Sequence, residues 1–176
     1  MLLNLKISET DRLFFIDFAS KYQKTNFFIR NGQSRQYCIL NKLTEQSIVK
    51  KAISIRNEKY MELGVNEFID EPIFGIFLGV NNEGGNVHQH KDPTVTDYDH
   101  VRINFLLSKP EKGGMPIIEE KELSIEEGDS WLNIANLWKH SSTPVVGNKD
   151  RVVLSLGALV SITQMKKLGY RNEKDF

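Results

Sequence analysis

The sequence has a single cysteine, Cys38, among 176 residues, so no disulfide can form within the chain. This excludes a disulfide-stabilised scaffold and is typical of proteins that fold in a reducing compartment. Hydrophobic runs are also short, and none approaches the roughly 20 apolar residues that a membrane-spanning helix needs. The apolar stretch at residues 1–5 is too short for a signal peptide. We therefore expect a soluble, cytoplasmic protein.

The chain also lacks an excess of charge of either sign, because 23 basic residues balance 23 acidic ones. A globally basic surface is absent, so nucleic acid is not an expected partner. No internal repeat, low-complexity segment or Pro/Gly/Ser-rich linker divides the sequence. With 40% hydrophobic residues, the chain is long enough to bury one core. We expect one domain over residues 1–176.

The first part of that domain, residues 1–70, is predicted to be mainly helical support. Ser8 precedes apolar residues at helical spacing and is expected to cap a first helix. Thr44 is expected to cap a second helix that ends near Gly64. A polar loop is expected between the two helices, around residues 31–34.

The second part, residues 71–165, has the short apolar runs and turn residues of β-strands. The predicted strands cover residues 73–80, 101–107, 116–118, 131–134 and 151–160. Strands at this spacing indicate a sandwich or barrel. Helices followed by strands make the predicted fold class α+β, with a β-barrel core.

The segment 87–92 carries the most informative motif. Alternate residues of an extended strand face the same side, so His88, His90 and Asp92 are all expected to point inward. Two ligand sets follow when His140 is added. One is His90, Asp92 and His140, which matches the two-histidine-one-carboxylate set of oxygen-activating Fe(II). The other replaces Asp92 with His88. We favour the first, while His100 is expected to be a loop residue outside the site.

A second group of polar residues is predicted near this metal site. Arg151 opens an otherwise apolar strand, and a guanidinium facing a barrel interior needs an anionic partner such as a carboxylate. Arg102 and Asn104 alternate on one strand and share a face. Asn133 lies two residues after Trp131 on another strand. All four residues are candidates for contact with a bound cofactor or substrate.

Residues 84–160 resemble the Fe(II)/2-oxoglutarate-dependent dioxygenases, closest to the cupin-like hydroxylases of the aspartyl/asparaginyl and prolyl type. The resemblance rests on the HxD pair His90 and Asp92, the distal His140, and Arg151 at the position that binds the far carboxylate of 2-oxoglutarate. It covers less than half of the chain. Val153 stands where many members carry a Ser, two residues after the Arg, which leaves the second contact to that carboxylate unassigned.

The resemblance implies a double-stranded β-helix (jelly-roll, cupin-like) core with the N-terminal helices packed on it. It also implies the cofactors Fe(II) and 2-oxoglutarate, the use of molecular oxygen, and hydroxylation of an amino-acid or peptidyl side chain with release of succinate and CO2. Two alternatives stay open: a cupin metalloenzyme that uses no oxo-acid, with His88 on the metal, and a non-enzymatic β-barrel binding module. The expected substrate is a small molecule or a peptide.

Overall fold

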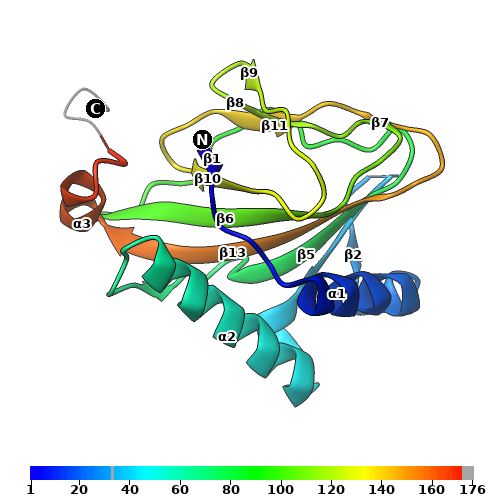
Figure 1. Cartoon of the computed structure of the whole chain (residues 1–176), viewed down its shortest axis with the longest axis horizontal. Coiled ribbons are helices and arrows are strands. Elements are labelled where there is room, and N and C mark those ends of the chain that lie inside the picture. The colour runs from blue at the N-terminus through cyan, green and yellow to red at the C-terminus, as the bar shows by residue number, and fades with distance from the viewer. Residues whose placement is uncertain (33, 172–176) are drawn as a thin grey trace.

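The computed structural model describes residues 1–32 and 34–171, in which one large antiparallel sheet separates helices from a second layer of short strands (Figure 1). The main sheet has the strand order β1 (Leu2–Leu3), β10 (Ser130–Ile134), β6 (Tyr98–Ser108), β13 (Arg151–Ser161), β5 (Ile76–Asn81), β3 (Arg35–Ile39) and β2 (Ile29–Arg30), and β4 (Ile69–Asp70) also pairs with β13.

The second layer lies across the face of the main sheet opposite to the helices (Figure 1). It has a three-stranded sheet in the order β11 (His140–Ser142), β8 (Pro116–Ile118) and β9 (Lys121–Glu122), and a pair formed by β12 (Val145–Val146) and β7 (Lys112–Gly113). All strand pairings among the described residues are antiparallel. The fold is therefore a mostly antiparallel β structure with few helices, in the α+β class.

The other face of the main sheet is covered by α1 (Glu9–Tyr22) and α2 (Gln46–Glu62) (Figure 1). Ser8 caps α1 as expected, because its side chain accepts a hydrogen bond from the backbone N–H of Asp11. The prediction for Thr44 is wrong: α2 has Glu45 at its N-cap, without a side-chain cap hydrogen bond. The short elements η1 (Leu40–Lys42) and α3 (Ile162–Lys167) complete the helices.

The alternation of side chains on the main sheet separates the core from the cavity. On β6, Val101, Ile103 and Phe105 belong to the large core packed against the helices. Arg102 and Asn104, which alternate with them, line a cavity on the other face. A smaller core closes the space between the layers and contains Leu106, Met115, Ile118, Leu123, Ile125, Trp131 and Val153. The main sheet thus has one apolar face and one face whose polar side chains line the cavity.

The predicted strands 116–118, 131–134 and 151–160 are present as β8, β10 and β13. Two differences affect the site. Strand β3 was not predicted, because the polar residues around it indicated a loop, yet it joins the main sheet beside β5. His100 lies in β6 and is buried, so the expectation of a loop residue is wrong. None of the described helices is long and apolar enough to cross a membrane.

Tyr60 provides a test of how the helix layer is attached. Its hydroxyl, on α2, lies 2.6 Å from the carbonyl oxygen of Val101 and 3.0 Å from that of Leu156, and the ring is fully buried. We expect Tyr60→Phe to lower the free energy of unfolding by about 1 kcal/mol, measured by urea denaturation. Tyr22→Phe is the matched control and should change little. Equal effects of the two substitutions would contradict this role of the hydroxyl.

Candidate metal centre

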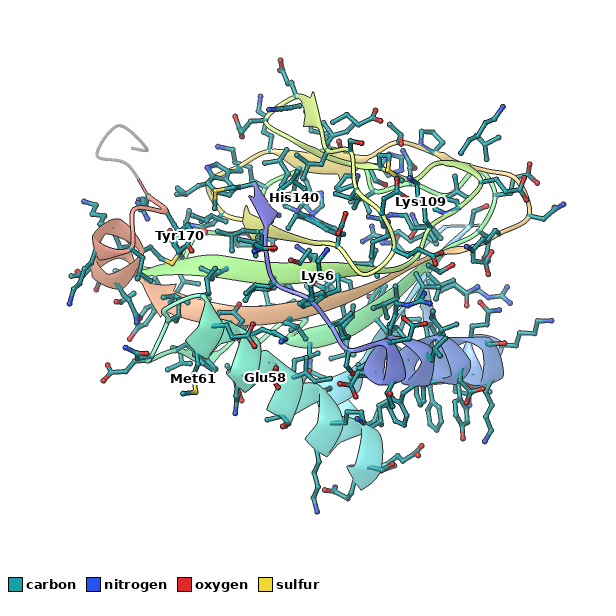
Figure 2. All side chains as sticks on the ribbon, in the orientation of Figure 1. Lys6, Glu58, Met61, Lys109, His140 and Tyr170 are labelled. Atoms are coloured by element: carbon teal, nitrogen blue, oxygen red, sulfur yellow. The ribbon has the colours of Figure 1, made fainter. Side chains whose placement is uncertain are left out.

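Three side chains that can bind a metal converge at one point between the two layers. His90, Asp92 and His140 each offer one ligand atom, and these atoms all lie within 4.8 Å of one another. His140 is on β11, and Figure 2 shows it in the space between the main sheet and the upper strands. The sequence separates His140 from Asp92 by 48 positions, so the fold assembles the group.

Backbone hydrogen bonds hold the two histidine-bearing segments together. The N–H of His90 donates to the carbonyl of His140 at 3.1 Å, and the N–H of His140 donates to the carbonyl of His90 at 3.0 Å. The N–H of Asp92 donates to the carbonyl of Ala135 at 2.8 Å. The segment that carries His90 and Asp92 is thereby fixed against the strand that carries the distal histidine.

Further hydrogen bonds orient each imidazole toward the same point. His90 Nδ1 donates to the carbonyl of His88 at 2.7 Å, and His140 Nδ1 donates to that of Trp138 at 3.1 Å. Each Nε2 is then left with its lone pair. These two Nε2 atoms lie 3.5 Å and 4.0 Å from Oδ1 of Asp92. Two imidazole nitrogens and one carboxylate oxygen are the donor set that non-haem Fe(II) takes, with open positions for other ligands.

His88 lies outside this group. Its side chain is exposed, and it is not among the potential metal ligands that the described part of the chain brings together. Because residues 86–89 form no regular strand, the alternation that predicted three inward side chains does not hold there. His88 contributes its backbone carbonyl to His90 instead. The ligand set with His88 in place of Asp92 has no support in this geometry.

The charge state of the carboxylate suits a metal ligand. Burial alone would raise the pKa of Asp92, but the neighbouring His90, Arg102 and His140 lower it to about 2. Burial lowers the pKa of His140. At neutral pH, Asp92 is therefore an anion and His140 is neutral, which are the forms that bind a cation.

Arg102 connects this centre to a residue that sequence analysis missed. Its Nε lies 3.5 Å from Oδ2 of Asp92, the carboxylate oxygen that faces away from the histidines. Its Nη2 donates to Oε2 of Glu71 at 2.8 Å, and the Glu71 side chain is only 1% exposed. Glu71 also accepts hydrogen bonds from the backbone N–H groups of residues 73, 74 and 75. Arg102 was predicted as a cofactor contact, but its guanidinium is occupied by these two carboxylates.

The metal group opens on a cavity of about 480 Å³ that Arg151 also lines. Arg151 is 6% exposed, and its Nε has no hydrogen-bond partner in the described structure. Its guanidinium lies 5.9 Å from the ring centroid of Trp131. Burial, together with the nearby charge of Arg35, lowers the pKa of Arg151 to about 10, so it is still charged at neutral pH. A buried cation without an anionic partner is costly, so this side chain is suited to receive an anion.

The two predicted asparagines also line the cavity, with different partners. Asn104 donates through Nδ2 to the carbonyl of Arg102 at 3.3 Å and is 3.5 Å from that of Trp131. Its amide is therefore largely satisfied by backbone. Asn133 is buried, and its Oδ1 has no partner among the described residues. Of the pair, Asn133 has the free polar atom that a bound molecule can use.

Sequence analysis missed Glu71, Arg35 and Asn81. Glu71 precedes Pro72 in a segment without periodicity, and only the fold brings it to Arg102. Arg35 lies on β3, which was not recognised as a strand. Asn81 ends β5 and reads from sequence as the start of a turn. The one available signal in the sequence was the alternation of Arg35 and Tyr37, which both line the cavity.

The Glu71–Arg102 pair gives a pH-dependent prediction. Burial would raise the pKa of Glu71, but Arg102 and three backbone N–H groups lower it below its usual value. A lowered native pKa stabilises the fold above the ordinary pKa of about 4.3, and this stability is lost as the pH falls. We expect Glu71→Gln to cost about 3 kcal/mol at pH 7, measured by urea denaturation. The difference in the free energy of unfolding between Glu71→Gln and wild type should become smaller below pH 4.3.

The exposed Glu67→Gln is the matched control, because it removes the same charge outside the cavity. Its free energy of unfolding should stay close to that of wild type at both pH values. A loss in Glu71→Gln that is as large at pH 3.5 as at pH 7 would contradict the ionic role of Glu71.

Comparisons with known proteins agree with this geometry at the level of the fold. No protein-family model matches the sequence, and no curated protein matches it. Among solved structures, a prolyl hydroxylase from Trichoplax adhaerens, in complex with a hypoxia inducible factor peptide fragment, superposes with a TM-score of 0.66 at 11% identity, covering 95% of this chain and 86% of that one.

Two bacterial structures are similarly close. A prolyl-4-hydroxylase from Pseudomonas putida matches with a TM-score of 0.64 at 11% identity, covering 92% of this chain and 91% of that one. A 2OG-Fe(II) oxygenase family protein from Burkholderia pseudomallei matches with a TM-score of 0.63 at 11% identity, over 91% and 83% of the two chains. This chain has the fold of the 2-oxoglutarate- and Fe(II)-dependent oxygenases.

Proposed function

We propose that this protein is an Fe(II)- and 2-oxoglutarate-dependent oxygenase that hydroxylates an amino-acid or peptidyl side chain, with succinate and CO2 as co-products. The observation that carries the proposal is the cluster of His90, Asp92 and His140 opening on a cavity that also contains the buried, unpaired Arg151. The superposed prolyl hydroxylases support it. In the same proposal, the two strand layers form a double-stranded β-helix, with residues 71–165 as its core and residues 1–70 as support.

The metal would be held by His90 Nε2, His140 Nε2 and Asp92 Oδ1, the three atoms that face one another. Arg102, whose Nε lies 3.5 Å from Oδ2 of Asp92, would hold this carboxylate in place. Bound Fe(II) and 2-oxoglutarate supply the oxidation of a C–H bond by molecular oxygen, coupled to decarboxylation. The tasks left to the protein are positioning and the exclusion of side reactions.

Arg151 would bind the carboxylate of 2-oxoglutarate that is remote from the metal. A guanidinium matches a carboxylate with two parallel hydrogen bonds, and the Nε of Arg151 is free for one of them. Gly114, at a φ of +66°, leaves room for this side chain, because an added Cβ would lie 2.9 Å from Cδ of Arg151. Trp131, Val153 and Ile118 give the cavity a buried apolar lining, which would help to exclude water from the reaction.

The ligand assignment is tested without turnover by metal binding. We expect His140→Ala and Asp92→Ala to lose the visible absorption of bound Co(II), because each removes one of three protein donors. His88→Ala is the matched control and should keep both the spectrum and an affinity within about twofold of wild type. Loss of binding in His88→Ala, with retention in Asp92→Ala, would establish the other ligand set.

The oxo-acid assignment is tested with 2-oxoglutarate and the iron-loaded protein. We expect Arg151→Gln to raise the KM for 2-oxoglutarate at least tenfold, a change of about 1.4 kcal/mol, because the carboxylate loses its charged partner. Succinate release measures the effect. Lys149→Gln, which removes an exposed cation two residues before Arg151, is the control and should leave the KM for 2-oxoglutarate unchanged. Release that survives both His140→Ala and Arg151→Ala would refute the proposed function.

A further inference from the structure

Three donor side chains form a row across the main sheet on its cavity face. Arg35 on β3 is in register with Asn81 on β5, and Asn81 is in register with Arg151 on β13. Side chains at directly paired positions of neighbouring strands point to the same face. All three line the cavity. Two guanidinium groups therefore flank one amide.

Among the described residues, donors of this row lack partners. The buried Nε of Arg151 and Nδ2 of Asn81 make no hydrogen bond within residues 1–32 and 34–171. Over the same residues, no carboxylate lies within 4 Å of a nitrogen of Arg35 or Arg151. Two like charges near each other, with buried unpaired donors between them, destabilise the protein unless anions join them. The row is therefore suited to anionic ligands.

The charges of the cavity indicate more than one anion. Asp92 is the only acidic residue among the described residues that line it, and the basic ones are Arg35, Lys91, Arg102 and Arg151. In the proposed site, a divalent metal, Asp92, the Glu71–Arg102 pair, Arg151 and the doubly negative 2-oxoglutarate leave no net charge. The charges of Lys91 and Arg35 then remain. Lys91 is exposed to water, whereas Arg35 is partly buried, so one further anionic group would serve as the counterion of Arg35.

The location of Arg35 associates that group with the substrate. Arg151 is 6% exposed, whereas Arg35 is only partly buried. Arg35 lines both the main cavity and a second, polar hollow of about 390 Å³ that also contains Asn31, Ser34 and His88. A side chain that lines both hollows is placed to contact a second molecule bound beside the deeper Arg151 site.

We propose that Arg35, assisted by Asn81, binds a carboxylate of the substrate, so that the protein acts on an acidic substrate. This inference rests on the proposed function, because it assigns the deeper Arg151 to 2-oxoglutarate. Two sources offer the same chemistry: the α-carboxylate of a free amino acid, and the side chain of Asp or Glu in a peptide.

The test uses the anaerobic protein loaded with Fe(II) and 2-oxoglutarate, which binds substrate without turnover. Calorimetric titration compares free Asp, Glu and Pro with their α-carboxamides, and blocked tripeptides containing Asp or Glu with those containing Asn or Gln. We expect at least one acid to bind tenfold more tightly than its amide partner. A preference among the free amino acids identifies the α-carboxylate as the group that Arg35 binds. A preference among the blocked tripeptides identifies the side-chain carboxylate.

Arg35→Gln should abolish this preference and leave the affinity for 2-oxoglutarate within about twofold of wild type. Arg35→Lys, which keeps the charge, should retain part of the preference, and Arg30→Gln, an exposed arginine on β2, should retain all of it. The inference is overturned if no acid binds more tightly than its amide, or if the preference for the acid survives Arg35→Gln. It is also overturned if Arg35→Gln weakens the binding of 2-oxoglutarate as much as Arg151→Gln does.

A failure of the proposed function gives a different result. If the protein does not use 2-oxoglutarate, adding 2-oxoglutarate to the wild-type Fe(II) protein gives no visible charge-transfer band, even before any substrate is added. If the band forms and the acids are not preferred, the oxygenase assignment stands and the role of Arg35 is wrong.

Discussion

The alternation of side chains on the main sheet, which continues past one register shift between Val152 and Val153, is the constraint on which the rest of the structure depends. On β6 and β13, one set of side chains is apolar and packs against α1 and α2, and the set between them faces the second layer. A shift of one residue in either strand would bury Arg102 and Arg151 among the helices and expose the core. The hydrophobic core therefore fixes the register, and the register fixes which polar groups reach the cavity.

Within that frame, the metal centre combines residues from distant parts of the chain. Glu71 precedes β5, Arg102 is in the middle of β6, and Asp92 lies in the segment between these strands. The chain of contacts from Glu71 through Arg102 links a buried carboxylate to Asp92, the carboxylate of the candidate metal centre. Partners of this kind orient the side chains that bind metals in proteins.

The predictable features were those set by local periodicity. Strand β13, helix α1 with its Ser8 cap, and the shared face of Arg102 and Asn104 all follow from patterns within a few residues. The features that the sequence did not predict depend on contacts with residues far away along the chain. His88 satisfies the same alternation as His90, but residues 86–89 form no regular strand, and only the bridge between His90 and His140 brings a histidine of this segment to the distal one. Arg35 and Glu71 lie in segments whose own sequence carries no strong signal.

The single thiol of the chain has a protected place in this arrangement. Cys38 lies on β3 between Tyr37 and Ile39, faces the helix-side core and is fully buried. Burial raises its pKa to about 12. The thiolate is the form that oxidants attack, and at neutral pH almost none of it is present. The main sheet lies between this sulfur and the cavity, so the proposed chemistry of iron and oxygen would take place on the face of the sheet opposite to the thiol.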